Sequence, residues 1–289
     1  MGSRTWLNIG LLILASALAI VTVYLPGIKE PAPLPALTSL NSAAITSIRI
    51  ERDAQPAITL KKEASSWRLT EPLQLPANTV VVESFLGLAQ TASHAQWATA
   101  SLDLEKFKLK SPRIRVHLND MELGFGDTEP LEGRRYVLAG ATVHLINDGY
   151  YPKLIAPPTS FVSLALLPGP EPITEIELPG LTLRRDARGW SAQPDAPPDA
   201  VNTLVQEWTA AQALQVRLYG APASQDKPVE IITVRQADET LRFLIVSRTP
   251  ELILARPEQG VQYHLPHDAA QRLLMLPAAG PADKSPPQQ

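Results

Sequence analysis

The sequence has no cysteine among its 289 residues. This absence excludes disulfide bonds, thiolate metal ligands, a cysteine nucleophile and a lipid-modified N-terminal cysteine. Positive charge is also in short supply, because 26 lysine and arginine residues face 29 aspartate and glutamate residues, for a net charge of −3. Such a chain has no basic stripe that could follow a phosphate backbone, so we expect no nucleic-acid partner.

The residue patterns of common enzyme classes are missing as well. There is no Gly-x-Ser-x-Gly and no His-Glu-x-x-His, so serine hydrolysis of the nucleophile-elbow type and zinc-dependent hydrolysis lack their usual residues. Gly124 and Gly126 fit a hairpin better than a phosphate loop, which needs a longer glycine-rich stretch before a helix. We therefore expect no catalytic residue, no cofactor and no metal.

Two small groups of polar residues are the best candidates for a metal or catalytic site. His264 and His267 stand three apart, but Pro266 between them breaks helical geometry, so a strand end and a helix start explain them better than a metal site. Three carboxylates could in principle serve glycoside chemistry, but a solvated acidic loop is the simpler interpretation for Asp127, Glu129 and Glu132.

A long uncharged run near the N-terminus predicts a membrane location. Residues 6–25 carry no charge, and twenty helical residues span about 30 Å, the thickness of a bilayer core. A cleavable signal peptide is the alternative, because residues 15–19 offer small side chains. With Arg4 before the run, the positive-inside rule predicts a single-pass inner-membrane protein, anchored in the lipid bilayer, with most of the chain in the periplasm.

Proline is abundant, with 28 residues, about twice the usual ~5%. Proline-rich stretches predict spacers that hold folded parts apart. They divide the chain into a cytoplasmic tail and membrane helix, a spacer, a first domain, a linker, a second domain and a disordered tail: residues 1–25, 26–44, 45–154, 155–172, 173–275 and 276–289.

The two predicted domains begin with similar sequences. "ITSI" starts at Ile45 and "ITEI" at Ile173. Alternating apolar residues follow in both, which is typical of half-buried strands. Trp67 comes seven residues after a leucine in the first block, and Trp190 does so in the second. The pattern predicts one domain present twice.

A helical pattern follows each tryptophan, with Phe85 on the first helix and Trp208 on the second. Further short strands and a short closing helix come after it. We therefore predict the α+β class, each domain being a mainly antiparallel sheet with one long and one short helix. We expect Trp67 and Trp190 to pack as structural residues near Phe85 and Trp208, rather than to stack on sugars.

These features resemble the bacterial family called domain of unknown function 4340. That family has an "I-x-x-I-x-I" strand, a strand that leads into a tryptophan and then a proline, and a helix. Here these are residues 45–50, Trp67 with Pro72, and residues 80–90. The later segments "DLEKFKLKSP" and "GRRYV" also fit, although Lys108 stands where the family usually has glycine.

The resemblance implies a partner rather than a reaction. Many members look like auxiliary, extracytoplasmic parts of ABC-type export systems related to the gliding-motility type, so a permease and an associated periplasmic subunit are the expected partners. A weakly basic run could face such a partner or lipid headgroups through Lys106, Lys108 and Lys110. The alternatives are an anchored module that binds a cell-wall polymer or lipid without a transporter, and an enzyme with an unrecognised site.

Overall fold

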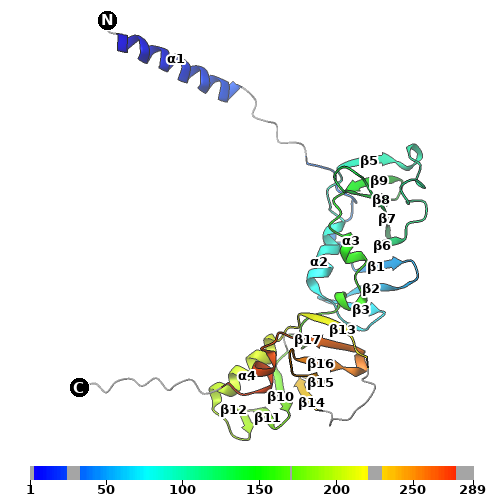
Figure 1. The fold of residues 1–289 in the computed structure, drawn as a ribbon, viewed down its shortest axis with the longest axis vertical. Coiled ribbons are helices and arrows are strands. Elements are labelled where there is room, and N and C mark those ends of the chain that lie inside the picture. Colours follow the sequence, from blue (N-terminus) through cyan, green and yellow to red (C-terminus); the bar gives the residue numbers. More distant parts are fainter. Residues whose placement is uncertain (1–2, 25–32, 170, 221–229, 278–289) are drawn as a thin grey trace. The chain divides into compact units, whose positions relative to one another are not determined.

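The computed structural model describes residues 3–24, 33–169, 171–220 and 230–277. The chain divides into two compact units, Met1–Pro35 and Ala36–Gln289. Helix α1 (Ser3–Tyr24) belongs to the first unit, and every described strand belongs to the second (Figure 1). The tail predicted for residues 276–289 lies almost wholly outside the described residues.

The predicted transmembrane helix is contradicted. Among the described residues, no helix is both long enough and apolar enough to cross a membrane. A membrane-spanning helix needs about 20 predominantly apolar residues. The predicted run of residues 6–25 included Asn8, Gly10 and Ser16, and its last residue lies outside the described part of the chain.

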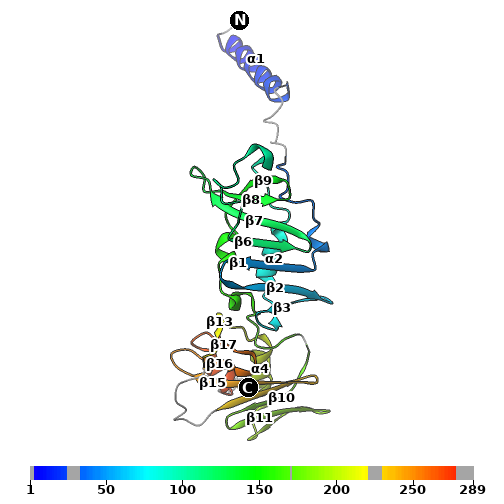
Figure 2. The same cartoon turned by 90° about the vertical axis from the view of Figure 1, so that its right-hand side faces the viewer.

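Nine antiparallel strands form the first sheet, in the order β4-β3-β2-β1-β6-β7-β8-β9-β5. Figure 2 shows the run from β3 to β9. Their bounds are β1 (Ser47–Arg52), β2 (Gln55–Glu63), β3 (Ser66–Glu71), β4 (Leu75–Pro76), β5 (Ala95–Ala98), β6 (Ile114–Leu118), β7 (Met121–Thr128), β8 (Arg135–Ala139) and β9 (Thr142–Ile146). Helix α2 (Thr79–Leu88) follows β4, and the short α3 (Tyr151–Leu154) follows β9.

Eight antiparallel strands form the second sheet, in the order β12-β11-β10-β14-β15-β16-β17-β13. Their bounds are β10 (Ile173–Leu178), β11 (Leu181–Asp186), β12 (Gly189–Gln193), β13 (Gln215–Leu218), β14 (Ile231–Gln236), β15 (Glu239–Ser247), β16 (Ile253–Arg256) and β17 (Val261–His264). Helix α4 (Pro198–Ala210) follows β12, and α5 (Ala269–Leu274) follows β17.

The predicted α+β class is also wrong, because antiparallel strands dominate the two sheets and the helices are few. The prediction missed β5 and β13, which follow the longer helix of each half and form an outer strand of each sheet. Each has four residues, and so short a strand gives almost no period-two signal.

The two sheets nevertheless share one strand order, apart from β4. If β1 to β3 are matched with β10 to β12, the remaining strands β6 to β9 and β5 match β14 to β17 and β13. Matching registers support this correspondence, because Ile48 pairs with Leu60 in the first sheet and Ile176 pairs with Leu183 in the second.

Each longer helix buries one apolar stripe. Helix α2 buries Val82, Phe85 and Leu88, and the side chain of Asn78 accepts hydrogen bonds from the first N–H groups of the helix. Such a cap satisfies donors that have no partner inside the helix. Helix α4 buries a similar stripe, comprising Ala200, Val201, Leu204 and Trp208.

The tryptophans occupy matching positions but differ in burial. Trp67 lies opposite Lys62 on β2, and Trp190 lies opposite Arg185 on β11. Trp67 is 9% exposed and belongs to the core, whereas Trp190 is half-buried and packs at the margin of the core. Trp67 is therefore a core residue, whereas Trp190 is only partly covered.

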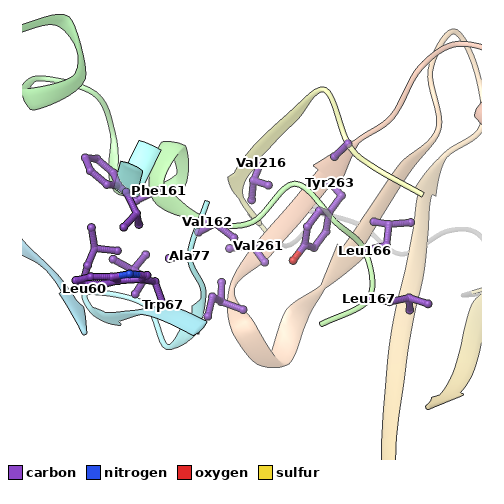
Figure 3. Close-up of a cluster of buried hydrophobic side chains, with 14 of the residues drawn as sticks. Leu60, Trp67, Ala77, Phe161, Val162, Leu166, Leu167, Val216, Val261 and Tyr263 are labelled. Carbon is purple, nitrogen blue, oxygen red and sulfur yellow. The ribbon is translucent and has the colours of Figure 1, made fainter. Parts of the chain in front are cut away.

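The stretch between the two blocks, predicted as a linker, contributes to the core. Phe161, Val162, Leu166 and Leu167 are all buried, and Figure 3 shows them among core side chains from both sheets. The 3₁₀ helix η3 (Pro158–Phe161) opens this connector, which we define as residues 158–167.

The differing burial of the two tryptophans gives a testable difference in stability. Replacing the buried Trp67 with alanine leaves a cavity and should cost about 3–5 kcal/mol of unfolding free energy. The same change at the half-buried Trp190 removes less buried surface and should cost clearly less. Denaturant unfolding of both variants, followed by circular dichroism, measures the two losses, and equal losses would contradict this account of the packing.

Candidate binding surface

Three of the four aromatic residues singled out in the sequence, Trp67, Phe85 and Trp208, lie in the core rather than at a binding surface. The ring of Phe85 stacks on Phe161 with centroids 5.8 Å apart. The indole Nε1 of Trp208 donates to the carbonyl oxygen of Leu273 at 2.9 Å, and its ring lies 5.9 Å from that of Phe243. A buried indole N–H needs such an acceptor, so these contacts are those of packing residues.

The three lysines of the basic run are exposed. The ammonium group of Lys108 lies 3.0 Å from Asp127, and that of Lys110 lies 3.1 Å from Glu105. Exposed pairs of this kind contribute little to stability, but they cancel much of the local positive charge. The run is therefore a weaker candidate for a lipid or partner surface than its sequence suggests.

Glycine explains why the lysine-bearing loop lies against β7. A Cβ at Gly126 would come within 2.3 Å of the carbonyl oxygen of Phe107, and that oxygen accepts a hydrogen bond from the Asp127 N–H at 3.0 Å. Leu109 beside it is 1% exposed. The close approach of two backbones is possible because Gly126 has no side chain.

The histidines do not gather into a metal site. His264 is buried, with Nδ1 2.8 Å from Glu251 and Nε2 2.9 Å from the amide nitrogen of Gln262. His267 is exposed. No group of three or more His, Cys, Asp or Glu side chains suited to a metal occurs in the described part of the chain.

A serine–histidine pair is present but buried. The Nδ1 of His144 lies 3.0 Å from Ser93 Oγ, and burial lowers the pKa of His144. The hydroxyl of Ser93 donates to the carbonyl oxygen of Ala95 at 3.0 Å, and the residue is 1% exposed. A nucleophile must reach a substrate, so this pair is better suited to holding β5 near β9.

A polar hollow lies on the first sheet, where β1, β2 and β6 meet. We call it the arginine cleft. It has a volume of about 460 Å³ and is lined by Arg49, Glu51, Arg52, Asp53, Ala54, Gln55, Ala57, Arg113 and Arg115. Four arginines against two carboxylates leave a surplus of positive charge, which favours an anionic ligand or an acidic segment of a partner.

Ion pairs fix some of these arginines and leave others available. Arg49 lies 3.0 Å from Glu51 and 2.7 Å from Glu71, and its hydrogen bond lowers the pKa of Glu51. Arg115 has only a longer contact, 3.5 Å, with Glu122. Arg113 is exposed and has no ion pair within the described ranges. Arg113 and Arg115 are therefore the groups best placed to bind.

Arg52 plays a different part. It is 8% exposed, and its Nη1 donates to the carbonyl oxygen of Ala156 at 2.7 Å, just after helix α3. A cation near the carboxyl end of a helix is favourable. Burial lowers the pKa of Arg52, and no carboxylate among the described residues pairs with it. This hydrogen bond links the rim of the cleft to the segment that follows helix α3.

The arginine cleft was not predicted in the sequence analysis. More than sixty residues separate Arg49 from Arg113 and Arg115, and only the register of β1 with β6 brings them together by placing Glu51 opposite Arg115. Adjacent strands put such residues side by side on one face. The available signal was the alternation of arginines at 113 and 115 in a predicted strand.

The backbone conformation of Lys108 leads to a second testable prediction about stability. Its φ of 56° lies in the left-handed region, which costs most residues about 1–2 kcal/mol but not glycine. Lys108→Gly and Lys108→Ala both remove the pair with Asp127. The glycine variant should be more stable than the alanine variant by about 0.5–1 kcal/mol. The relief of backbone strain exceeds the extra conformational entropy that glycine loses on folding. Thermal and denaturant unfolding measure the stability of the two variants. Equal stability of the alanine and glycine variants would show that the backbone at position 108 is not strained.

Comparison with known proteins gives a family. Residues 67–240 match the family model described as "Domain of unknown function (DUF4340)". The matched region starts in β3 and ends in β15, so it includes parts of both sheets. No curated protein and no solved structure shows significant similarity to the chain. Since the match covers more than half of the sequence, the chain belongs to the DUF4340 family.

Proposed function

We propose that this protein is a non-catalytic binding subunit of an ABC-type transport assembly of the cell envelope. In this proposal its two sheets lie on the periplasmic side, and it contacts the permease and an associated periplasmic subunit. The chemistry belongs to the ATPase of the assembly, and this chain contributes binding surface.

The arginine cleft is the observation that carries the proposal. Arg113, just before β6, and Arg115 on β6 line an open hollow, and among the described residues their one ion pair is the 3.5 Å contact of Arg115 with Glu122. Arginine is well suited to interfaces because its planar guanidinium makes paired hydrogen bonds with carboxylates. The family resemblance supplies the kind of assembly, because related proteins look like auxiliary parts of export systems.

Two further features support a binding role over a catalytic one. The histidines at 144 and 264 are engaged within the fold. Several charged side chains on the sheet faces are used in ion pairs between neighbouring strands, such as those of Glu175 on β10 with Arg235 on β14 and with Arg184 on β11. Cross-strand pairs of this kind stabilise a sheet and need no substrate.

Purification from the native cell tests the proposal. The full-length protein, tagged and extracted in mild detergent, should bring down a permease and an ATPase in fixed ratio. Arg113→Glu with Arg115→Glu should lower their recovery at least tenfold, because reversed charges in an interface repel an acidic partner.

A matched control separates a specific contact from a general charge effect. Arg242 is exposed on β15 of the second sheet, and Arg242→Glu should leave recovery unchanged. Recovery of a cell-wall polymer or lipid without permease or ATPase would favour the module that acts without a transporter. Equal recovery with the Arg113 and Arg115 variants would reject the cleft as the contact.

A further inference from the structure

The two sheets differ at one edge. In the first sheet β3 is covered by β4, through the pairs Arg68 with Pro76 and Leu69 with Leu75. In the second sheet β12 takes the position of β3, but it pairs only with β11. Within the described residues, β12 is therefore an open edge where the first sheet has a ninth strand.

The lengths of two loops explain the difference. After Pro72, six residues precede helix α2, and they include β4. Pro194 holds the matching place in the second sheet, and only three residues lie between it and helix α4. The last of these three is Pro197, and the helix itself begins with Pro198. Three residues cannot form a strand that turns back along β12, and proline has no N–H to donate.

The first sheet also shows which backbone groups face the open edge. The carbonyl oxygen of Trp67 accepts a hydrogen bond from the N–H of Ala77 at 2.9 Å, so the backbone of Trp67 points away from β2. The registers match Trp67 with Trp190 and Leu69 with Ala192. The N–H and C=O groups of Trp190 and Ala192 therefore face outward, and no described residue pairs with them.

Side chains at this edge are incompletely covered. In the first sheet Leu75 on β4 is 1% exposed, and Leu69 opposite it is fully buried. Trp190 and Ala192 at the matching positions are only half-buried. A strand added to β12 with an apolar residue opposite Ala192 would cover them, as Leu75 covers Leu69.

Arginines outnumber carboxylates in the β11–β12 hairpin, and Glu175 and Glu177 on β10 face Arg184 from the next strand. A cleft of about 310 Å³ on β11 and β12 is lined by Thr182, Arg184, Ser191, Ala192 and Gln193. Arg184 is exposed and uses its Nε for Glu175, which leaves its two terminal nitrogens without a partner among the described residues. Arg185 and Arg188 are exposed nearby, against one aspartate in the same hairpin.

We propose that the β12 edge binds an extended acidic peptide segment of a partner protein as a ninth antiparallel strand. Main-chain hydrogen bonds would give the affinity, as in other cases of strand addition. An apolar residue would lie opposite Ala192, and an acidic neighbour would reach Arg184. A second copy of this chain fits less well, because pairing two such edges would bring arginine-rich hairpins together.

This inference concerns a different surface from the arginine cleft and holds whether or not the chain serves a transporter. The probe is a fluorescein-labelled peptide, Thr-Val-Glu-Leu-Glu-Val-Thr, and its match has lysine in place of both glutamates. Fluorescence anisotropy with the full-length protein should show the acidic peptide binding about tenfold more tightly than the lysine peptide. Hydrogen exchange should show the amides of Trp190 and Ala192 protected on binding.

Variants at two positions test the geometry. Ala192→Pro removes an outward N–H without touching a hydrogen bond to β11 and should weaken the acidic peptide about tenfold. Ala192→Val keeps the N–H and should bind within about twofold of wild type. Arg184→Gln should reduce the preference for the acidic peptide, while Glu175 keeps its contact with Arg235 at 3.1 Å.

Three results would overturn the proposal. The first is equal binding, or no binding, of the two peptides. The second is an Ala192→Pro variant that melts like wild type and still binds fully. The third is a dimer in sedimentation equilibrium that Ala192→Pro abolishes, because that result would assign the edge to a second copy.

Discussion

The connector of residues 158–167 is the constraint on which the arrangement of the sheets depends, because its backbone bonds to both. Toward the first sheet, the N–H of Asn78 donates to Phe161 and the N–H of Ser163 donates to Pro76, each at 2.8 Å. A buried backbone group without a partner is costly, so these bonds explain how a proline-bordered stretch can run through the core. They also fix the start of helix α2, which Asn78 caps.

The same stretch bonds to the second sheet a few residues later. The N–H of Leu166 donates to Ala211 at 3.1 Å, and the N–H of Ala213 donates to Leu164 at 2.8 Å. These bonds lie just before β13, the last strand of that sheet. The edge ending in β4 and the edge ending in β13 are thus both tied to the connector, whereas β12 lies at the opposite end of its sheet. The place of the open edge follows from this arrangement.

Some of this could be predicted from the sequence and some could not. The alternation of apolar residues located the first strands of each half, because a half-buried strand repeats every two residues. The burial of the connector was invisible, since prolines at 157, 158 and 168 resemble a spacer. The membrane helix was wrongly predicted from an uncharged run. The arginine cleft depends on strand register, which composition does not reveal.

The outer faces show how one topology can serve two purposes. In the first sheet Gly124 and Gly126 let a loop cross β7, and the registers place Leu244 and Val246 at the matching positions of β15. Side chains there would collide with a loop packed in the same way. Because the two halves share a strand order, such substitutions change what covers a sheet without changing the sheet. The first half closes its β3 edge with β4, while β12 in the second half pairs with β11 alone among the described strands.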